Sequence, residues 1–295
     1  MRAFPPLLIM VAAIGAGATM DAAIKYLART NPVLIVALAR YAFASAISFA
    51  VWWHAGRPRI TPVMWRGHAL RGIIIAFSAV TFFWSLTVLP LAEAVTISFI
   101  YPLIAPFVAR AIVGEQVRPT AVIAAIIGFA GVLIAVLGTP STEANEQHTL
   151  GLIAVLFSAL TFAVSMVLMR ARALADGPII VSLMASFIPG LIVAGPAIAL
   201  SPPPHIADWP VFAFLGVIAA LFMYLISHAY ARAEAQQLAP IHYTELLWAS
   251  VYGFVLFHET PRPQLYFGAA LIIAACLYAA YQDRKLTAKA AANPA

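Results

Sequence analysis

The stretch IHYTELLW, residues 241–248, places two side chains that can carry a charge or a proton inside an apolar run. Glu245 lies about ten residues from either end of the run 235–257, and His242 precedes it by three residues on roughly the same helical face. A carboxyl group there can bind a cationic solute, carry a proton, or stay protonated and bonded to a neighbouring helix. The sequence leaves these three roles open. No third ligand lies at a usable spacing, so we expect no metal and no cofactor.

A second group of charges lies near the start of the chain. Asp21 and Lys25 are four residues apart on one helical face, and Arg40 lies at a similar depth in the next apolar run. We expect an Asp21 to Arg40 ion pair that clamps two neighbouring helices, with Lys25 extending to the outer interface. The alternative is that Arg40 or Lys25 binds a carboxylate of a solute.

Aromatic side chains at a similar depth are candidates for the wall of a binding site. Tyr101 opens the segment YPLIAP, in which Pro102 and Pro106 remove backbone donors in the middle of an apolar run. Such a disturbance is tolerated where the backbone lines a cavity or packs inside protein. Trp84 and Trp248 lie near the same depth, and each could equally serve in packing alone.

The elements that position these residues are predicted membrane helices. Of the 295 residues, 63% are hydrophobic and 9% are charged, and the mean hydropathy is +0.95. These values exclude an ordinary soluble domain, and a helix of about 20 apolar residues crosses a bilayer. We therefore expect an all-α integral membrane protein with ten transmembrane helices. The predicted spans are 5–27, 33–54, 68–88, 91–113, 119–138, 150–171, 178–200, 209–231, 235–257 and 264–282.

The basic residues predict the orientation of the chain. If the N-terminus is cytoplasmic, most of the 17 lysines and arginines fall on the cytoplasmic side, as the positive-inside rule requires. Both termini are then cytoplasmic, in a bacterial-type inner membrane. This bias also explains the net charge of +6, so we expect no nucleic-acid partner. The single cysteine, Cys276, excludes an internal disulfide framework.

The two halves of the sequence resemble each other at an offset of 144 residues. GEQVRP at 114–119 aligns with HETPRP at 258–263, so that Glu115 matches Glu259. The same offset places Tyr101 on Glu245, and Pro240 precedes the polar cluster of the second copy. Because each copy contains five predicted spans, an odd number, the copies must enter the membrane from opposite sides.

This organisation predicts a first repeat at 5–138, a second repeat at 150–283 and a cytoplasmic tail at 284–295. Inverted repeats are typical of secondary transporters, which bind the solute near the midplane between the repeats. We find no nucleophile or metal motif that indicates a membrane-embedded enzyme, and a scaffold or sensor gives no reason for the repeat. Small residues such as Gly128 and Gly131 allow close helix contacts, but a homodimer does not follow because the repeats can satisfy each other.

Several segments together resemble a known family across nearly the whole chain. They are AAIKYL, LARYAFAS, LPLAEAVTISFIYPLIAPFVARAIVGE and LLWASVYGFVLFHE. In this order they are similar to the EamA family of the drug/metabolite transporter superfamily, whose members are ten-helix carriers. The segments MDAAIKYL, LRGIIIAF and APIHYTELLW are most similar to the branch that contains S-adenosylmethionine uptake carriers. Amino-acid and other metabolite exporters belong to the same family.

These observations predict a carrier that works by alternating access on a small zwitterionic metabolite, either S-adenosylmethionine-like or an amino acid. Glu245, with His242, would bind a cationic or amino group, and Arg40 or Lys25 would bind a carboxylate. Tyr101, Trp84 and Trp248 would form the wall of the site. The alternative is an exporter of other small metabolites or drugs. The sequence does not decide the direction of transport or the coupling ion.

Overall fold

The computed structural model describes residues 6–114, 117, 119–137, 146–230, 241–242 and 244–292, and every element in these ranges is a helix. The elements are α1 (Pro6–Leu27), α2 (Val33–His54), α3 (Pro62–Val88), α4 (Leu91–Ser98), α5 (Tyr101–Val113), α6 (Pro119–Leu137), α7 (Glu146–Asp176), α8 (Pro178–Leu200), η1 (Ile206–Asp208), α9 (Trp209–Tyr230), α11 (Thr244–Phe257) and α12 (Pro263–Ala292). Glu115 and Pro240, which the repeat comparison uses, lie outside the described residues. So do the predicted repeat bounds 5 and 138 and the last residues of the predicted tail.

Seven helical spans of the described residues are long and apolar enough to cross a membrane. They correspond to α1, α2, α3, the pair α4 and α5, α7, α8, and η1 with α9. Three shorter apolar stretches lie in α6, α11 and α12, over 122–134, 244–257 and 263–275. The described part of the chain is therefore all-helical, and the chain is a multi-pass membrane protein. The predicted tail from 284 onward begins as a continuation of α12, which ends at Ala292.

The fourth predicted span is not one continuous helix. α4 ends at Ser98, and α5 begins at Tyr101 after a short turn in which the Ile100 amide donates to the Ile97 carbonyl. Pro102 explains the break, because it has no amide hydrogen for the Ser98 carbonyl and its ring clashes with the backbone four residues earlier. The break places Tyr101 at the start of a new helix in the middle of the span. α4 itself lies in the core, and its residues 91–97 are all buried.

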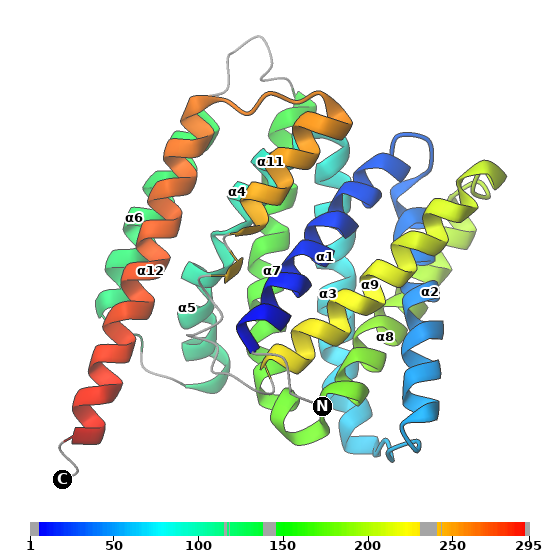
Figure 1. The fold of residues 1–295 in the computed structure, drawn as a ribbon, viewed down its shortest axis with the longest axis horizontal. Helices are drawn as coiled ribbons and strands as arrows, with labels where there is room; N and C mark the ends of the chain where they lie inside the picture. Colours follow the sequence, from blue (N-terminus) through cyan, green and yellow to red (C-terminus); the bar gives the residue numbers. More distant parts are fainter. Residues whose placement is uncertain are drawn as a thin grey trace.

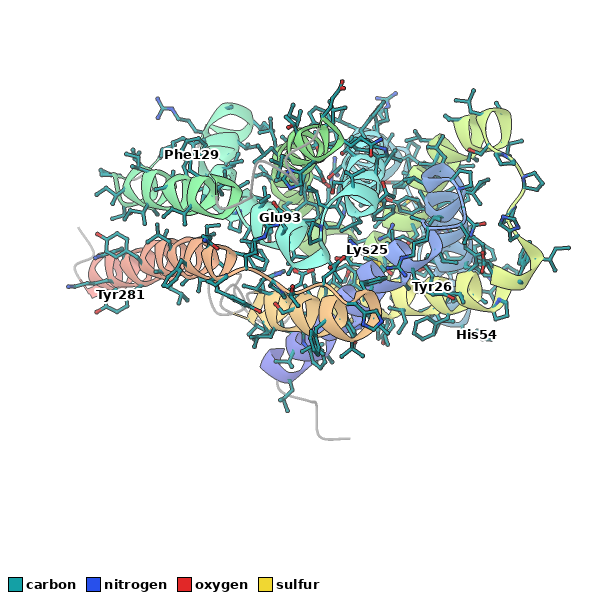
Figure 2. The ribbon with its side chains drawn as sticks, turned by 90° about the horizontal axis from the view of Figure 1, so that it is seen from above. Lys25, Tyr26, His54, Glu93, Phe129 and Tyr281 are labelled. Atoms are coloured by element: carbon teal, nitrogen blue, oxygen red, sulfur yellow. The ribbon has the colours of Figure 1, made fainter. Side chains whose placement is uncertain are left out.

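The helices form a bundle in which α6 and α12 lie side by side at one edge, whereas α2, α8 and α9 pack together at the other (Figure 1). α4 and α11 contact each other between these two groups. The view from above in Figure 2 shows Phe129 and Tyr281 on the α6 and α12 pair, and both side chains are exposed, as expected for positions that face lipid. Lys25 and Glu93 lie inside the bundle.

Polar contacts fix the helix connections at both ends of the bundle. At the end where α1 meets α2, the Asn31 side chain donates to Asp208 of η1 over 2.7 Å and accepts from the His205 amide over 3.2 Å. At the opposite end, a buried hydrogen bond of 3.0 Å joins His68 Nε2 of α3 to Asp176 Oδ2 at the end of α7. Each contact joins the first half of the chain to the second.

The crossing of α6 and α12 depends on the absence of a side chain at Gly131. A Cβ atom there would lie 2.7 Å from the Gly268 carbonyl oxygen and 2.9 Å from Ile272 Cγ1. We expect Gly131→Ala to lower the free energy of unfolding in mixed micelles by about 1–3 kcal/mol, because a backbone oxygen cannot move aside. The matched control is Gly195→Ala in α8, where nothing lies within 4 Å. It should be neutral or stabilise by up to about 1 kcal/mol. Equal effects of the two changes would contradict close packing at Gly131.

Candidate functional site

Three of the predicted site residues converge from three helices. Glu245 at the start of α11 interacts electrostatically with Asp21 of α1, and Asp21 interacts in turn with Arg40 of α2. Asp21 and Arg40 are buried, with 5% and 9% of their surface exposed, whereas Glu245 is half-buried. Asp21 therefore interacts electrostatically with a second carboxyl group and with a guanidinium group inside the bundle. Burial of such charges in a membrane costs free energy, so residues of this kind are candidates for a functional site.

Among the described contacts, no ion pair of 4.0 Å or less joins Asp21 to Arg40, although the two groups interact electrostatically, so the clamp stays a prediction. Arg40 Nε instead donates to the Met20 sulfur over 3.2 Å. The guanidinium also lies 4.4 Å from the ring centre of Tyr41 and 5.5 Å from that of Phe83. Cation–π contacts compensate part of the cost of burying the charge. A thioether is a weak acceptor, and a guanidinium has five N–H donors, so Arg40 has donor capacity for a carboxylate.

Aromatic rings lie beside these charges. Tyr101 packs edge-to-face against Phe162 of α7, with ring centres 4.9 Å apart, and against His242, with ring centres 6.4 Å apart. His242 precedes Glu245 by three residues in the sequence. The structure thus brings His242 beside Tyr101, whereas the place of Glu245 in the same site stays a prediction. Phe162 was not predicted from the sequence, because nothing in its own segment distinguishes it from other apolar residues.

The two tryptophans lie in different surroundings. Trp248 stacks on Tyr252 one turn further along α11, with ring centres 6.1 Å apart, and its ring passes Gly15 of α1. The Tyr252 hydroxyl forms a hydrogen bond of 2.8 Å with the Thr19 hydroxyl, which further joins α11 to α1. Trp84 lies half-buried on α3, and none of its described contacts joins it to Glu245, Tyr101 or Arg40. A role for Trp84 in the wall of the site stays a prediction.

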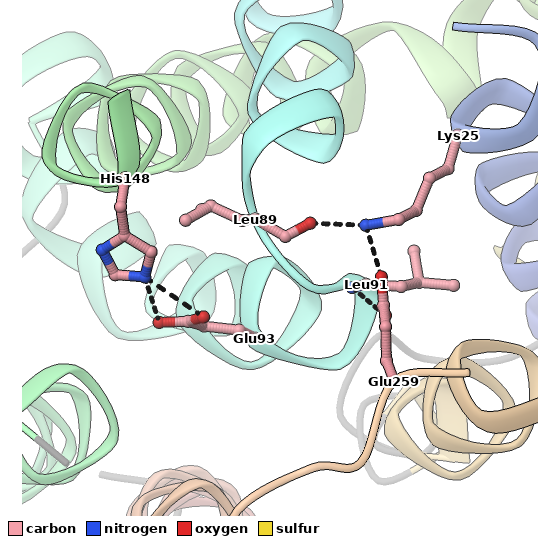
Figure 3. A network of polar contacts seen from close by, with 6 residues as sticks. All are labelled: Lys25, Leu89, Leu91, Glu93, His148 and Glu259. Carbon is pink, nitrogen blue, oxygen red and sulfur yellow. Dashed lines mark hydrogen bonds and ion pairs between the residues drawn. The ribbon is translucent and has the colours of Figure 1, made fainter. Parts of the chain in front are cut away.

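Lys25 lies apart from the central group, in a separate polar network near the end of α1 (Figure 3). Its ammonium group forms an ion pair of 2.8 Å with Glu259 and donates to the Leu89 carbonyl over 2.5 Å. A cavity of about 300 Å³ adjoins this pair. The expected extension of Lys25 to the outer interface is therefore replaced by pairing inside the protein. The repeated Glu-x-x-Arg-Pro motif contains Glu259, but a motif alone does not identify the residue that Glu259 contacts.

Sequence reasoning also missed the pair formed by Glu93 and His148. His148 Nε2 at the start of α7 lies 3.2 Å and 3.4 Å from the two carboxylate oxygens of Glu93 on α4, and both residues are 8% exposed (Figure 3). Glu93 lies in the segment LAEAV, where an isolated acid in an apolar helix could have indicated a buried partner. Within the described ranges, no three histidine, cysteine or acidic side chains are arranged to hold a metal ion.

Comparison with known proteins places this arrangement among membrane transporters. The model of the EamA-like transporter family matches residues 4–137 and again residues 149–281. An S-adenosylmethionine uptake transporter of Rickettsia bellii (strain RML369-C) is 23% identical over 269 residues, which is 91% of each chain. A riboflavin transporter of Brucella anthropi is 25% identical over 282 residues, which cover 93% of this chain and 98% of the relative. A crystal structure of another protein has a TM-score of 0.68 at 22% identity, over 95% of this chain and 98% of that one, and so shares the fold.

Proposed function

Because the chain belongs to the EamA-like transporter family, we propose that it is a secondary transporter that moves a cationic or zwitterionic metabolite across the inner membrane by alternating access. The family resemblance expected from the sequence is confirmed, and the protein is a membrane transporter of small molecules and not an enzyme. The identity of the solute, the orientation in the membrane and the mechanism of access are parts of the proposal.

The helix contacts support two inverted repeats. When α1, α2, α3, α5 and α6 are exchanged for α7, α8, α9, α11 and α12, the main contacts map onto one another. The contact of α1 with α9 becomes that of α7 with α3, and the contact of α1 with α11 becomes that of α7 with α5. α1 and α7 run in opposite directions through the bundle (Figure 1). Two matches of one family model, about 145 residues apart, agree with this exchange.

The direction of the helices also supports the proposed orientation. α1 begins and α12 ends at the same end of the bundle (Figure 1). The connection between α2 and α3 lies at this end and contains Arg57 and Arg59, and Arg66 follows in the first turns of α3. Basic residues in short connections are retained in the cytoplasm. We therefore assign this end to the cytoplasm and call the opposite end, where α1 meets α2, the outer end.

The charges of the central group favour a solute with both a carboxylate and cationic groups. Asp21 and Glu245 provide two acidic groups, and the guanidinium of Arg40 has donors for a carboxylate. S-adenosylmethionine carries a sulfonium, an ammonium and one carboxylate, so its charges complement the three side chains. The electrostatic interactions of Asp21 with Arg40 and of Glu245 with Asp21 are the observation that carries the proposal. The neutral ring system of riboflavin would use the aromatic side chains but would leave these charges without partners.

Purified protein in proteoliposomes tests this function directly. With radiolabelled solutes on one side, we expect saturable uptake of S-adenosylmethionine that excess unlabelled S-adenosylmethionine inhibits. Labelled methionine, lysine and riboflavin form the rest of the panel, and protein-free liposomes give the background. If only riboflavin were taken up, the proposed solute would change from S-adenosylmethionine to riboflavin, after which the Brucella relative is named. An absence of saturable flux for every zwitterion would contradict the proposal.

A further inference from the structure

A cluster at the outer end joins three segments of the chain around Pro90. Lys25 near the end of α1 and Glu259 after α11 form an ion pair of 2.8 Å. Lys25 Nζ also donates to the Leu89 carbonyl, and the Leu91 amide donates to Glu259 Oε2 over 2.8 Å (Figure 3). The ion pair therefore holds the backbone on both sides of Pro90, at the turn between α3 and α4. We call these four side-chain and backbone groups the Pro90 clamp.

The clamp satisfies backbone groups that the helices cannot satisfy themselves. The Leu89 carbonyl follows the last turn of α3, and the Leu91 amide opens α4, so neither has a partner within its own helix. The ammonium group of Lys25 lies at the negative end of the α3 dipole, and the carboxylate of Glu259 lies at the positive end of the α4 dipole. Each charge is stabilised by its partner and by a helix end. Loss of either side chain removes one contact to the turn and the ion pair together.

The surroundings of the clamp strengthen it. The Lys25 and Glu259 side chains are only 10% and 20% exposed, and the Phe257 ring lies 5.5 Å from the Lys25 ammonium. Charges that are partly shielded from water interact more strongly than surface charges. The cavity of about 300 Å³ lies beside the clamp, and fully buried Leu86 is among its lining residues. The contacts thus join the helices at the outer end directly beside this cavity.

The segments that the clamp joins also carry the central group. α1 carries Asp21 about one turn before Lys25, and α11 carries Glu245 about 18 Å of helix before its end. The turn at Pro90 leads through α4 to the break before Tyr101. Separation of the α3–α4 turn from α1 and α11 would therefore open a path from the outer end towards the central residues.

We propose that Lys25 and Glu259 form the outer gate of the transporter, closed in this structure by the Pro90 clamp. The inference rests on the proposed alternating access, and it assigns Lys25 and Glu259 as positioning residues that control access to the central group. Release of the clamp exposes the buried side of the cavity to the outside. Closure restores the ion pair and the two backbone contacts.

The gate can be tested without any solute by cysteine labelling. The background is the full-length protein with Cys276→Ser, which removes its single cysteine, and the reporter is Leu86→Cys. In right-side-out membrane vesicles, a membrane-impermeant maleimide should label the reporter slowly in this parent. Glu259→Gln should raise the labelling rate about tenfold, because it removes the charge that holds Lys25 while it keeps the size of the side chain. Lys25→Gln, the second variant, should have the same effect.

Two controls separate gate opening from loss of structure. Glu146→Gln removes an exposed carboxylate at the start of α7, also at the outer end, and should leave the rate within twofold of the parent. A second reporter, Ser165→Cys, sits at a buried position of α7 and should stay unlabelled in every variant. An unchanged rate at Leu86→Cys in Glu259→Gln and Lys25→Gln would overturn the gate, and so would faster labelling of both reporters. Labelling only in inside-out vesicles would also overturn an outer gate. A lack of S-adenosylmethionine flux would contradict the proposed function but would not alter these rates.

Discussion

Glu245→Gln is expected to lower kcat/KM for the proposed uptake of S-adenosylmethionine about 100-fold, which corresponds to about 2.7 kcal/mol. Glutamine has nearly the same shape as glutamate but provides no negative charge for a sulfonium or ammonium group. Loss of one partner from a charge pair shielded from water costs about 2–5 kcal/mol, so the expected effect lies in the lower part of this range. Initial uptake rates in proteoliposomes at several solute concentrations measure it. Glu146→Gln, which removes an exposed carboxylate, is the matched control and should stay within twofold of the parent.

Counterflow distinguishes the three roles that the sequence leaves open for Glu245. Exchange of labelled for unlabelled solute requires binding but no net movement of protons. If Glu245 binds the solute, Glu245→Gln loses both net uptake and counterflow. If it only carries a proton, the variant keeps counterflow and loses uptake driven by a pH gradient. If it only bonds a neighbouring helix, the variant loses thermal stability while the protein that remains folded transports normally. Either of the last two results would remove Glu245 from the solute-binding residues.

The helix positions could be predicted from the sequence because the membrane dictates them locally. Apolar runs of about 20 residues must be helical in lipid, and such a run specifies its own backbone hydrogen bonds. The predicted spans 33–54 and 178–200 coincide with α2 and α8 for this reason. The break between α4 and α5 was harder to predict from the sequence. Prolines at 102 and 106 indicated a disturbance, but only the packed structure determines that the chain breaks before Tyr101 while α5 continues through Pro106.

The charge partners could not be predicted to the same extent, because they depend on helix tilt and rotation. Equal depth made Asp21 and Arg40 plausible partners, and the two groups do interact electrostatically, but the described hydrogen bond of the Arg40 guanidinium goes to the Met20 sulfur. Lys25 lies one turn beyond Asp21, and its partner Glu259 is 234 residues away in sequence. A hydropathy pattern indicates how deep a residue lies in the membrane, but it does not indicate in which direction around the helix axis the side chain points. The burial of these charged residues was therefore predictable, whereas the partners of their side chains were not.

Arg40 provides the sharpest test of how the carboxylate of the solute is bound. Its guanidinium is buried, and its described contacts are a weak acceptor and two aromatic rings. A solute carboxylate would supply two charge-assisted hydrogen bonds in the fork geometry that guanidinium favours. The contrasting role is structural, in which Arg40 only offsets the negative charge of Asp21. The two roles predict different dependence on the solute, so a solute that lacks the carboxylate separates them.

Arg40→Met is expected to lower kcat/KM for S-adenosylmethionine about 100-fold and that for decarboxylated S-adenosylmethionine less than fivefold. The reason is that the second solute keeps the sulfonium and the ammonium but has no group for Arg40 to bind, and about 2.7 kcal/mol is the corresponding loss for the first. Arg40→Lys keeps the positive charge but loses the paired N–H donors of the guanidinium. Its kcat/KM for S-adenosylmethionine should lie between those of the parent and of Arg40→Met. Competition uptake assays with both solutes and a thermal unfolding midpoint for each variant provide the measurements. Equal losses for the two solutes, together with a lower midpoint, would identify Arg40 as a structural counter-charge for Asp21, and the carboxylate would then need another partner.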